Sequence, residues 1–383
     1  MAMKMTQGAP IMFGPGALAI LGEQLEMRGL HKPIIITDKG VTSVGVTEKV
    51  AQAAKSAGLE CTVYDDCLSD APSDSITVAA DAIRAAKADC IIALGGGSSM
   101  DTAKAASMII NEPKSIVDLL GLPPRKPDLP IITIPTTSGT GSEVTIVGVV
   151  SNSKTSKKAG AIISGLELAI VDPELTVGLP PSITAATGMD VVAHSVEAIT
   201  GKFRNPMSDM RGFESLRMVA AHLKAAVDDG TNIEARAGMS FASTLAGLAF
   251  VDSTTSLGHA TAQALASVFH LHHGLLCGLG TPPQLELFAA VVPERVRKIA
   301  EVFGAAIPYD ATNEQIGKIA ANKMREFMRQ VGLPSFETLG YTRDQIVAQA
   351  GALMEERMKD VSPIEIDLAT AEKNLSLMYD YKE

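Results

Sequence analysis

The sequence lacks the features that mark membrane and secreted proteins. No apolar run is long enough to cross a bilayer, and the first ten residues contain no apolar core of a signal peptide. Cysteines are few and none shows a CxxC spacing typical of metal sites. Cys90 lies in an apolar run, where a small core residue is expected rather than half of a disulfide. We therefore expect a protein of the reducing cytoplasm.

Positive charge is also scarce. The chain has 33 Lys and Arg against 43 Asp and Glu, a formal net charge of −10. Such a balance disfavours nucleic acids and anionic membrane surfaces as partners. Hydrophobic residues make up 46% and charged residues 20% of the 383 residues, which indicates a folded globular protein long enough for two domains.

The first half alternates short β-branched runs with amphipathic stretches. Predicted strands cover residues 33–37, 61–64, 90–94 and 129–134, and predicted helices cover 46–58, 75–88 and 100–110. This alternation predicts a doubly wound α/β domain with a parallel, Rossmann-like sheet.

Two glycine-rich loops follow predicted strands directly. In Gly95–Lys104, GGGSSMDTAK, the glycines let backbone N–H groups approach an anion, and the next helix directs its N-terminus at the same group. The second loop, Pro135–Glu143, is rich in hydroxyls and glycine. A pyrophosphate is the expected ligand, although the pattern is not GxGxxG. The alternative is a pair of tight turns with no ligand.

Asp38 ends the first predicted strand. An acidic residue there can bind the ribose 2′-OH and repel a 2′-phosphate, which favours NAD over NADP. The alternative is a helix N-cap.

After Pro180 the strand-like runs stop, and we place the domain boundary there: an α/β domain over residues 1–180 and a helical domain over 181–383. The predicted helices cover residues 182–200, 208–228, 233–251, 259–266, 293–303, 313–331, 342–359 and 368–378.

Histidine is concentrated in one apolar stretch, residues 254–274, which carries four of the seven: His259, His270, His272 and His273. Upstream, Asp190 and His194 are four residues apart and share a helix face. Two such segments predict a site for Fe²⁺ or Zn²⁺, and the donor types suit either ion. His272 should point away from a site served by His273, and His270 should line the substrate pocket or be exposed.

Together these motifs resemble the iron-containing (group III) alcohol dehydrogenase family over nearly the whole chain. The match includes FGPGA at residues 13–17, GGGSSMD, PTTSGTGSE, VDPEL with LPP, GMDVVAHSVEA, and a final HG at residues 273–274.

The resemblance implies a dehydroquinate synthase-like, all-helical second domain, a homodimer, and a metal bound by Asp190, His194, His259 and His273. For the NAD site it implies the following residues: Asp38, Gly96, Gly97, Ser98, Asp101, Thr136, Thr137 and Lys158. As catalytic residues we expect His259, His273 and His270.

Three positions depart from the family pattern. Gln263 stands where a histidine is usual, which leaves the path of the alcohol proton open. LLCGLGTPP follows His273 instead of ANAxLLP, and Ala71-Pro72 replaces the usual NP turn.

We expect reversible hydride transfer between NAD(H) and a small neutral alcohol, aldehyde or ketone whose oxygen is polarised by the metal. One alternative is a lyase of the dehydroquinate synthase type, which would need basic residues for an anionic substrate. The segments around the candidate ligands are almost free of them. A second alternative is a degenerate relative that binds metal or nucleotide without catalysis. It stays open because Gln263 stands where the family usually has a histidine.

Overall fold

The computed structural model describes residues 8–112, 114–155 and 157–383. Residues 1–7, part of the segment read for a signal peptide, lie outside this range. The chain forms two compact units, one ending at Gly178 and the other beginning at Leu179.

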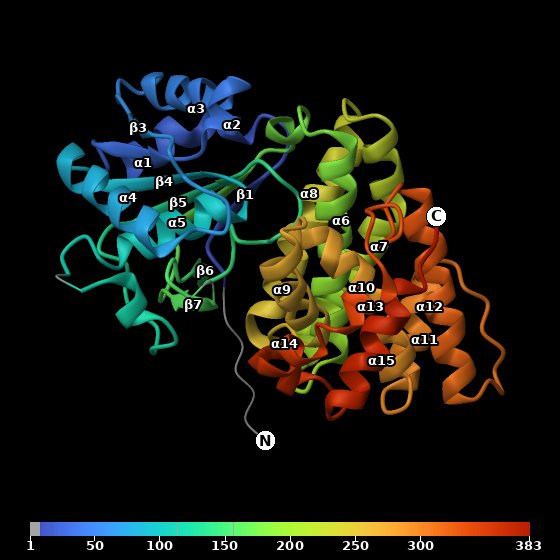
Figure 1. Cartoon of the computed structure of the whole chain (residues 1–383). Coiled ribbons are helices and arrows are strands. Elements are labelled where there is room, and N and C mark those ends of the chain that lie inside the picture. The colour runs from blue at the N-terminus through green and yellow to red at the C-terminus, as the bar shows by residue number, and fades with distance from the viewer. Residues whose placement is uncertain (1–7, 113, 156) are drawn as a thin grey trace. The chain divides into compact units, whose positions relative to one another are not determined.

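The α/β unit is built on a parallel sheet (Figure 1). Within the described residues it has six strands in the order β1-β8-β5-β4-β2-β3. Their bounds are β1 Ile11–Phe13, β2 Pro33–Ile36, β3 Thr62–Tyr64, β4 Cys90–Gly95, β5 Ile131–Pro135 and β8 Leu168–Val171. The four predicted strands are confirmed, and so is the α/β class. β1 and β8 were missed because runs of three and four residues carry little periodic signal.

Helices cover both faces of this sheet. They are α1 Leu21–Met27, α2 Lys39–Ser43, α3 Val46–Lys55, α4 Ser73–Ala86 and α5 Gly97–Ser107. Because side chains alternate along a strand, Ile34 and Ile36 of β2 pack in the core shared with α4 and α5, whereas Ile35 packs with α1 and α3. A separate antiparallel hairpin, β6 Val147–Ser151 and β7 Lys158–Ile162, was not predicted.

The second unit is helical throughout its named elements. Its helices are α6 Pro181–Thr200, α7 Pro206–Asp228, α8 Ile233–Ser253, α9 Leu257–Phe269, α10 His273–Phe288, α11 Pro293–Val302, α12 Asn313–Gln330, α13 Arg343–Val347, α14 Ala350–Glu355 and α15 Leu368–Tyr379. The single helix predicted over 342–359 is instead α13, α14 and a 3-10 turn, Arg357–Val361. Among the described residues, no helix combines the length and apolar character that a membrane span requires.

α10 was missed by the prediction because three glycines and two prolines interrupt its pattern. Two of those glycines have a packing role. A methyl group on Gly274 would lie 2.4 Å from the carbonyl oxygen of Ala186, and one on Gly278 would lie 2.8 Å from Cβ of Met189. Both contacts are on α6. The glycines therefore let α10 approach α6 closely enough for their side chains to meet.

Candidate functional site

Helix α6 supplies the first part of the candidate site. Every residue from Thr184 to Thr200 is buried, so its polar side chains must find partners inside the protein. Asp190 and His194 lie one turn apart, with Nδ1 of His194 3.9 Å from Oδ1 of Asp190. The His194 ring stacks on Phe250 of α8 at 4.4 Å between centroids, which fixes its orientation.

Two more histidines reach Asp190 from the starts of α9 and α10. Nε2 of His259 lies 3.6 Å and Nε2 of His273 lies 4.0 Å from Oδ1 of Asp190. The ring centroids of His194 and His259 are 4.3 Å apart, and those of His259 and His273 are 5.4 Å apart. The structure thus brings together all four residues expected to bind the metal.

Glu197 was not singled out in the sequence, yet it organises the start of α9. Its carboxylate is fully buried and accepts backbone N–H bonds from Ser256, Gly258 and His259, at 2.9, 2.6 and 3.2 Å. Glu197 thereby caps α9, since the side chain of the N-cap residue Ser256 makes no capping hydrogen bond. The available signal was spacing, because Glu197 lies seven residues after Asp190 on the same face of α6.

Glu197 also orients His259. Oε2 of Glu197 lies 2.7 Å from Nδ1 of His259, which directs Nε2 toward Asp190. Gly258 makes this approach feasible, since a methyl group there would lie 2.7 Å from Oε1 of Glu197. A carboxylate behind a histidine is the usual support for a metal-binding imidazole.

Cys277 also belongs to this cluster, which the sequence reading did not anticipate. One donor atom each from Asp190, His259, His273 and Cys277 lie within 4.8 Å of one another. Sγ of Cys277 is 3.5 Å from Nε2 of His273. The signal in the sequence was the four-residue spacing from His273. His194 borders this group of four through its contacts with Asp190 and His259.

Near pH 7 the cluster holds an ionised Asp190 beside a neutral His194 and a neutral Cys277. Burial opposes ionisation of Asp190, but the facing imidazoles, His194 foremost, outweigh it and hold the pKa of Asp190 well below its usual range. Burial lowers the pKa of His194 to about 4, so its ring is neutral near pH 7. Burial also raises the pKa of the Cys277 thiol to about 12.

Unsatisfied polar atoms test whether a metal fits. Oδ1 of Asp190, Nδ1 of His194 and Nε2 of His259 are buried and have no hydrogen-bond partner among the described residues. Buried polar atoms of this kind are rare and costly. Oxygen and imidazole donors facing a common point are what a divalent transition metal binds, so the residues fit such an ion.

The remaining histidines of the stretch lie at its turn. His270 ends α9 in the left-handed conformation, with φ 53°, and His272 precedes α10; both are exposed. Gln263 lies one turn after His259 on α9 and is half-buried. The catalytic role expected for His270 stays a prediction.

In the α/β unit, the predicted nucleotide-binding residues gather where neighbouring parallel strands end. β5, β4 and β2 are adjacent, and each ends at the same edge of the sheet. Gly95 has φ 138°, which favours glycine, and α5 begins directly after Gly96. A methyl group on Gly97 would lie 2.8 Å from Cγ2 of Thr140, so the two loops touch. Thr136 donates its backbone N–H to the carbonyl of Gly95 at 3.0 Å.

Asp38 follows β2 and is an N-cap. Its Oδ1 accepts the backbone N–H of Val41 at 3.0 Å, and its Oδ2 accepts the Ser99 hydroxyl at 2.8 Å. The N-cap alternative is therefore correct as far as local structure goes. A cap and a ribose contact are compatible, because a carboxylate accepts several hydrogen bonds.

Asp101 and Lys158 have structural partners as well. Asp101 accepts the hydroxyl of Ser142 at 2.7 Å and the backbone N–H of Val149 at 3.0 Å, which ties the second loop and β6 to α5. Lys158 pairs with Asp70 at 2.6 Å, and the Asp70 N–H donates to Oγ of Ser98 at 3.0 Å. The residues expected around the cofactor are thus already linked to one another.

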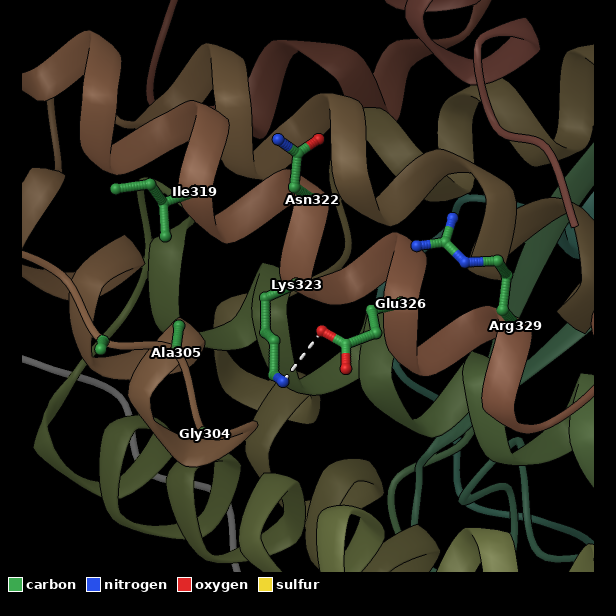
Figure 2. A pocket seen from close by; sticks show the side chains of 8 residues that line it. Gly304, Ala305, Ile319, Asn322, Lys323, Glu326 and Arg329 are labelled. Carbon is green, nitrogen blue, oxygen red and sulfur yellow. Dashed lines mark hydrogen bonds and ion pairs between the residues drawn. The ribbon is translucent and has the colours of Figure 1, made fainter.

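A hollow elsewhere in the helical unit contains none of this chemistry. It lies along α12 and the turn after α11, and Figure 2 shows Lys323 and Glu326 among the side chains that line it. These two side chains pair with each other at 3.0 Å. None of its lining residues is a histidine or cysteine, so it offers no candidate metal site.

Comparison with known proteins agrees with this geometry. Residues 9–173 match the family described as iron-containing alcohol dehydrogenase, and residues 184–377 match its C-terminal family. A choline dehydrogenase of Bacillus subtilis (strain 168) is 33% identical over 91% of this chain and 87% of that protein. A 1,3-propanediol dehydrogenase of Klebsiella pneumoniae is 32% identical over 84% of each chain.

A solved structure agrees over the full length. The sulfoacetaldehyde reductase of Bifidobacterium kashiwanohense, determined in complex with NAD+, superposes with a TM-score of 0.89 at 30% identity and covers 100% of both chains. The two family matches together span both units of the structure. The chain belongs to the iron-containing alcohol dehydrogenase family of oxidoreductases.

Proposed function

We propose that this protein interconverts a small neutral alcohol with its aldehyde or ketone, using NAD(H) and a divalent metal. The observation that carries the proposal is the convergence of Asp190, His194, His259 and His273, three of which hold a buried donor atom without a hydrogen-bond partner. Structural cores satisfy such atoms, whereas ligand sites leave them available.

A bound Fe²⁺ or Zn²⁺ supplies a Lewis acid for the substrate oxygen, and NAD+ supplies the hydride acceptor. The protein's contribution is orientation. Glu197 accepts the Nδ1 proton of His259, which leaves the Nε2 lone pair directed at the metal position. Phe250 holds the His194 ring by stacking. The donor types suit both ions, and we propose Fe²⁺ on the family's description and keep Zn²⁺ as the alternative.

For the cofactor we propose NAD, bound at the loops after β2, β4 and β5. Gly96, Gly97 and Ser98 open α5, whose first N–H groups suit a pyrophosphate. The cofactor set also includes Asp101, Thr136, Thr137 and Lys158. Asp38 would favour NAD by repelling a 2′-phosphate. The relative solved with NAD+ supports the choice.

The substrate class follows from charge. α6, α9 and α10 contain no lysine or arginine. Recognition of a polyanion normally uses such residues, so the lyase alternative is disfavoured. The relatives are named for choline, 1,3-propanediol and sulfoacetaldehyde, and their variety supports a small alcohol or aldehyde without selecting one. His259, His273 and His270 stay the proposed catalytic histidines, and a homodimer in the cytoplasm stays a prediction.

The test uses protein freed of metal and reloaded with Fe²⁺ or Zn²⁺. NADH formation is measured over a panel of short alcohols, and NADH or NADPH consumption over the matching aldehydes. Asp190→Asn should abolish metal-dependent turnover, whereas Asp310→Asn, at an exposed turn, should not change it. Turnover that persists without metal would refute the proposal. Absence of both metal and NAD binding would favour a non-catalytic relative.

A further inference from the structure

Cys277 is the one cysteine of the helical unit; the other three precede residue 179. It lies on α10, one turn after His273, and is completely buried. A buried cysteine is ordinarily a small core residue. This one differs because its sulfur faces polar atoms, with Nε2 of His273 at 3.5 Å.

The spacing on α10 matches the spacing on α6. Residues at i and i+4 share a helix face, so α6 presents Asp190 and His194 together, and α10 presents His273 and Cys277 together. The close approach of the two helices at Gly274 and Gly278 brings these two pairs against each other. Cys277 lies between these two glycines in the sequence, directly before Gly278.

The distances agree with a single coordination sphere. Bonds of about 2.0–2.3 Å to one zinc ion keep any two of its donor atoms within about 4.6 Å of each other. The separations of donor atoms in the structure are 3.5 Å from Cys277 to His273, 3.6 Å from His259 to Asp190 and 4.0 Å from His273 to Asp190, all below this limit. Two of these donor atoms, Oδ1 of Asp190 and Nε2 of His259, are buried and have no hydrogen-bond partner among the described residues.

We propose that Cys277 binds the metal directly through its sulfur, beside the four ligands Asp190, His194, His259 and His273. The proposal rests on the metal site of the proposed function and adds a ligand to it. Binding converts the thiol to a thiolate and releases one proton to solvent. A thiolate is a soft donor. It therefore raises the affinity of the site for Zn²⁺ and Co²⁺ relative to Fe²⁺, compared with a site of oxygen and nitrogen donors alone.

Cobalt provides a direct test in the full chain. Metal-free protein is titrated with Co²⁺, whose visible bands report binding and whose near-ultraviolet charge-transfer band reports a thiolate ligand. We expect the charge-transfer band in the unaltered protein and its loss in Cys277→Ser. The affinity for Zn²⁺ relative to Fe²⁺, measured by competition, should fall in that variant. Cys67→Ser, a buried cysteine of the α/β unit, is the matched control.

A second variant covers the case in which Cys277→Ser does not fold. In a chain with Cys61, Cys67 and Cys90 all replaced by serine, Cys277 is the sole thiol, and the charge-transfer band must persist. Bound Co²⁺ without that band would overturn the thiolate ligand and leave the proposed metal site standing. Failure of the unaltered protein to bind Co²⁺, Zn²⁺ or Fe²⁺ would instead overturn the proposed function itself.

Discussion

Oε2 of Glu197 lies 2.7 Å from Nδ1 of His259, and the same carboxylate caps the helix that begins beside that histidine. One buried side chain on α6 therefore sets both the direction of α9 and the orientation of a proposed ligand. His259 is held through its ring nitrogen and through its backbone N–H, 3.2 Å from Oε1. The donor position of Nε2 depends on this double contact.

Replacing that carboxylate tests the relationship. Glu197→Gln keeps the shape but removes the charge that supports the His259 imidazole. We expect a loss of metal affinity of about 10- to 100-fold, the usual effect of removing such a support. Competition with a chromophoric chelator measures it. Glu234→Gln, in the exposed first turn of α8, is the control for loss of one negative charge and should bind metal normally. Equal affinities in all three proteins would refute the role of Glu197.

The contact between α10 and α6 predicts a second effect. In Gly274→Ala the new methyl group would lie 2.4 Å from the Ala186 carbonyl oxygen, so α10 must shift and carry His273 with it. We expect about 1–3 kcal/mol of lost stability, as for other overpacked positions, and weaker metal binding. Gly351→Ala has open space around it in α14 and should be neutral or slightly stabilising. Denaturant unfolding compares them, and a Gly274→Ala variant as stable as the unaltered protein would contradict the packing argument.

Asp38 allows its two roles to be separated. Asparagine is an equally good N-cap, so Asp38→Asn should keep the bond to Val41. It loses the charge and presents an amide donor to the Ser99 hydroxyl in place of an acceptor. Asp38→Ala loses both the bond to Val41 and the charge, at a cost of about 1 kcal/mol. We expect both variants to bind NADP+ more tightly relative to NAD+, and only Asp38→Ala to be less stable. Cofactor titrations and unfolding curves measure the two effects. If Asp38→Asn retains the original preference, the carboxylate does not select the cofactor.

Lys104 predicts a pH dependence of stability. It is fully buried in the α/β unit, with Nζ 2.7 Å from the carbonyl of Ser142 and 3.0 Å from that of Val147. Burial lowers its pKa from 10.5 to about 8. Below pH 8 both folded and unfolded chains hold the proton, so the full cost of the buried charge is present. Between pH 8 and 10.5 the folded chain releases it first, and the stability contributed by Lys104 rises with pH.

The measurement compares the unaltered protein with Lys104→Met. Across that window the unaltered protein should gain up to about 3 kcal/mol over the variant, from a pKa difference of 10.5 minus 8. Lys55→Met, at an exposed position of α3, should show no such gain. Parallel pH profiles for the unaltered protein and Lys104→Met would show that Lys104 keeps its proton throughout.

The sequence alone determined the main strands of the α/β unit and the four residues of the candidate metal site. β-branched runs such as Pro33–Ile36 and Cys90–Gly95 form buried parallel strands because they are apolar on both sides, which a short window of sequence reveals. Asp190 and His194 could be paired from spacing alone, since helix geometry places residues four apart on one face. The joining of that pair with His259 and His273 was expected from residue type, and the distances place all four together.

Tertiary structure alone decided which other side chains meet them. Glu197 and Cys277 are separated by 80 positions in the chain, and each looked like an ordinary residue of its own segment. α10 has a weak helical pattern because prolines and glycines interrupt it, and two of the glycines, Gly274 and Gly278, serve packing against α6 rather than local helix propensity. Contacts between distant helices depend on how closely their backbones approach. The four residues Asp190, His194, His259 and His273 could therefore be proposed from the sequence. The contact of Glu197 with His259 and the position of the Cys277 sulfur beside His273 are known only from the folded chain.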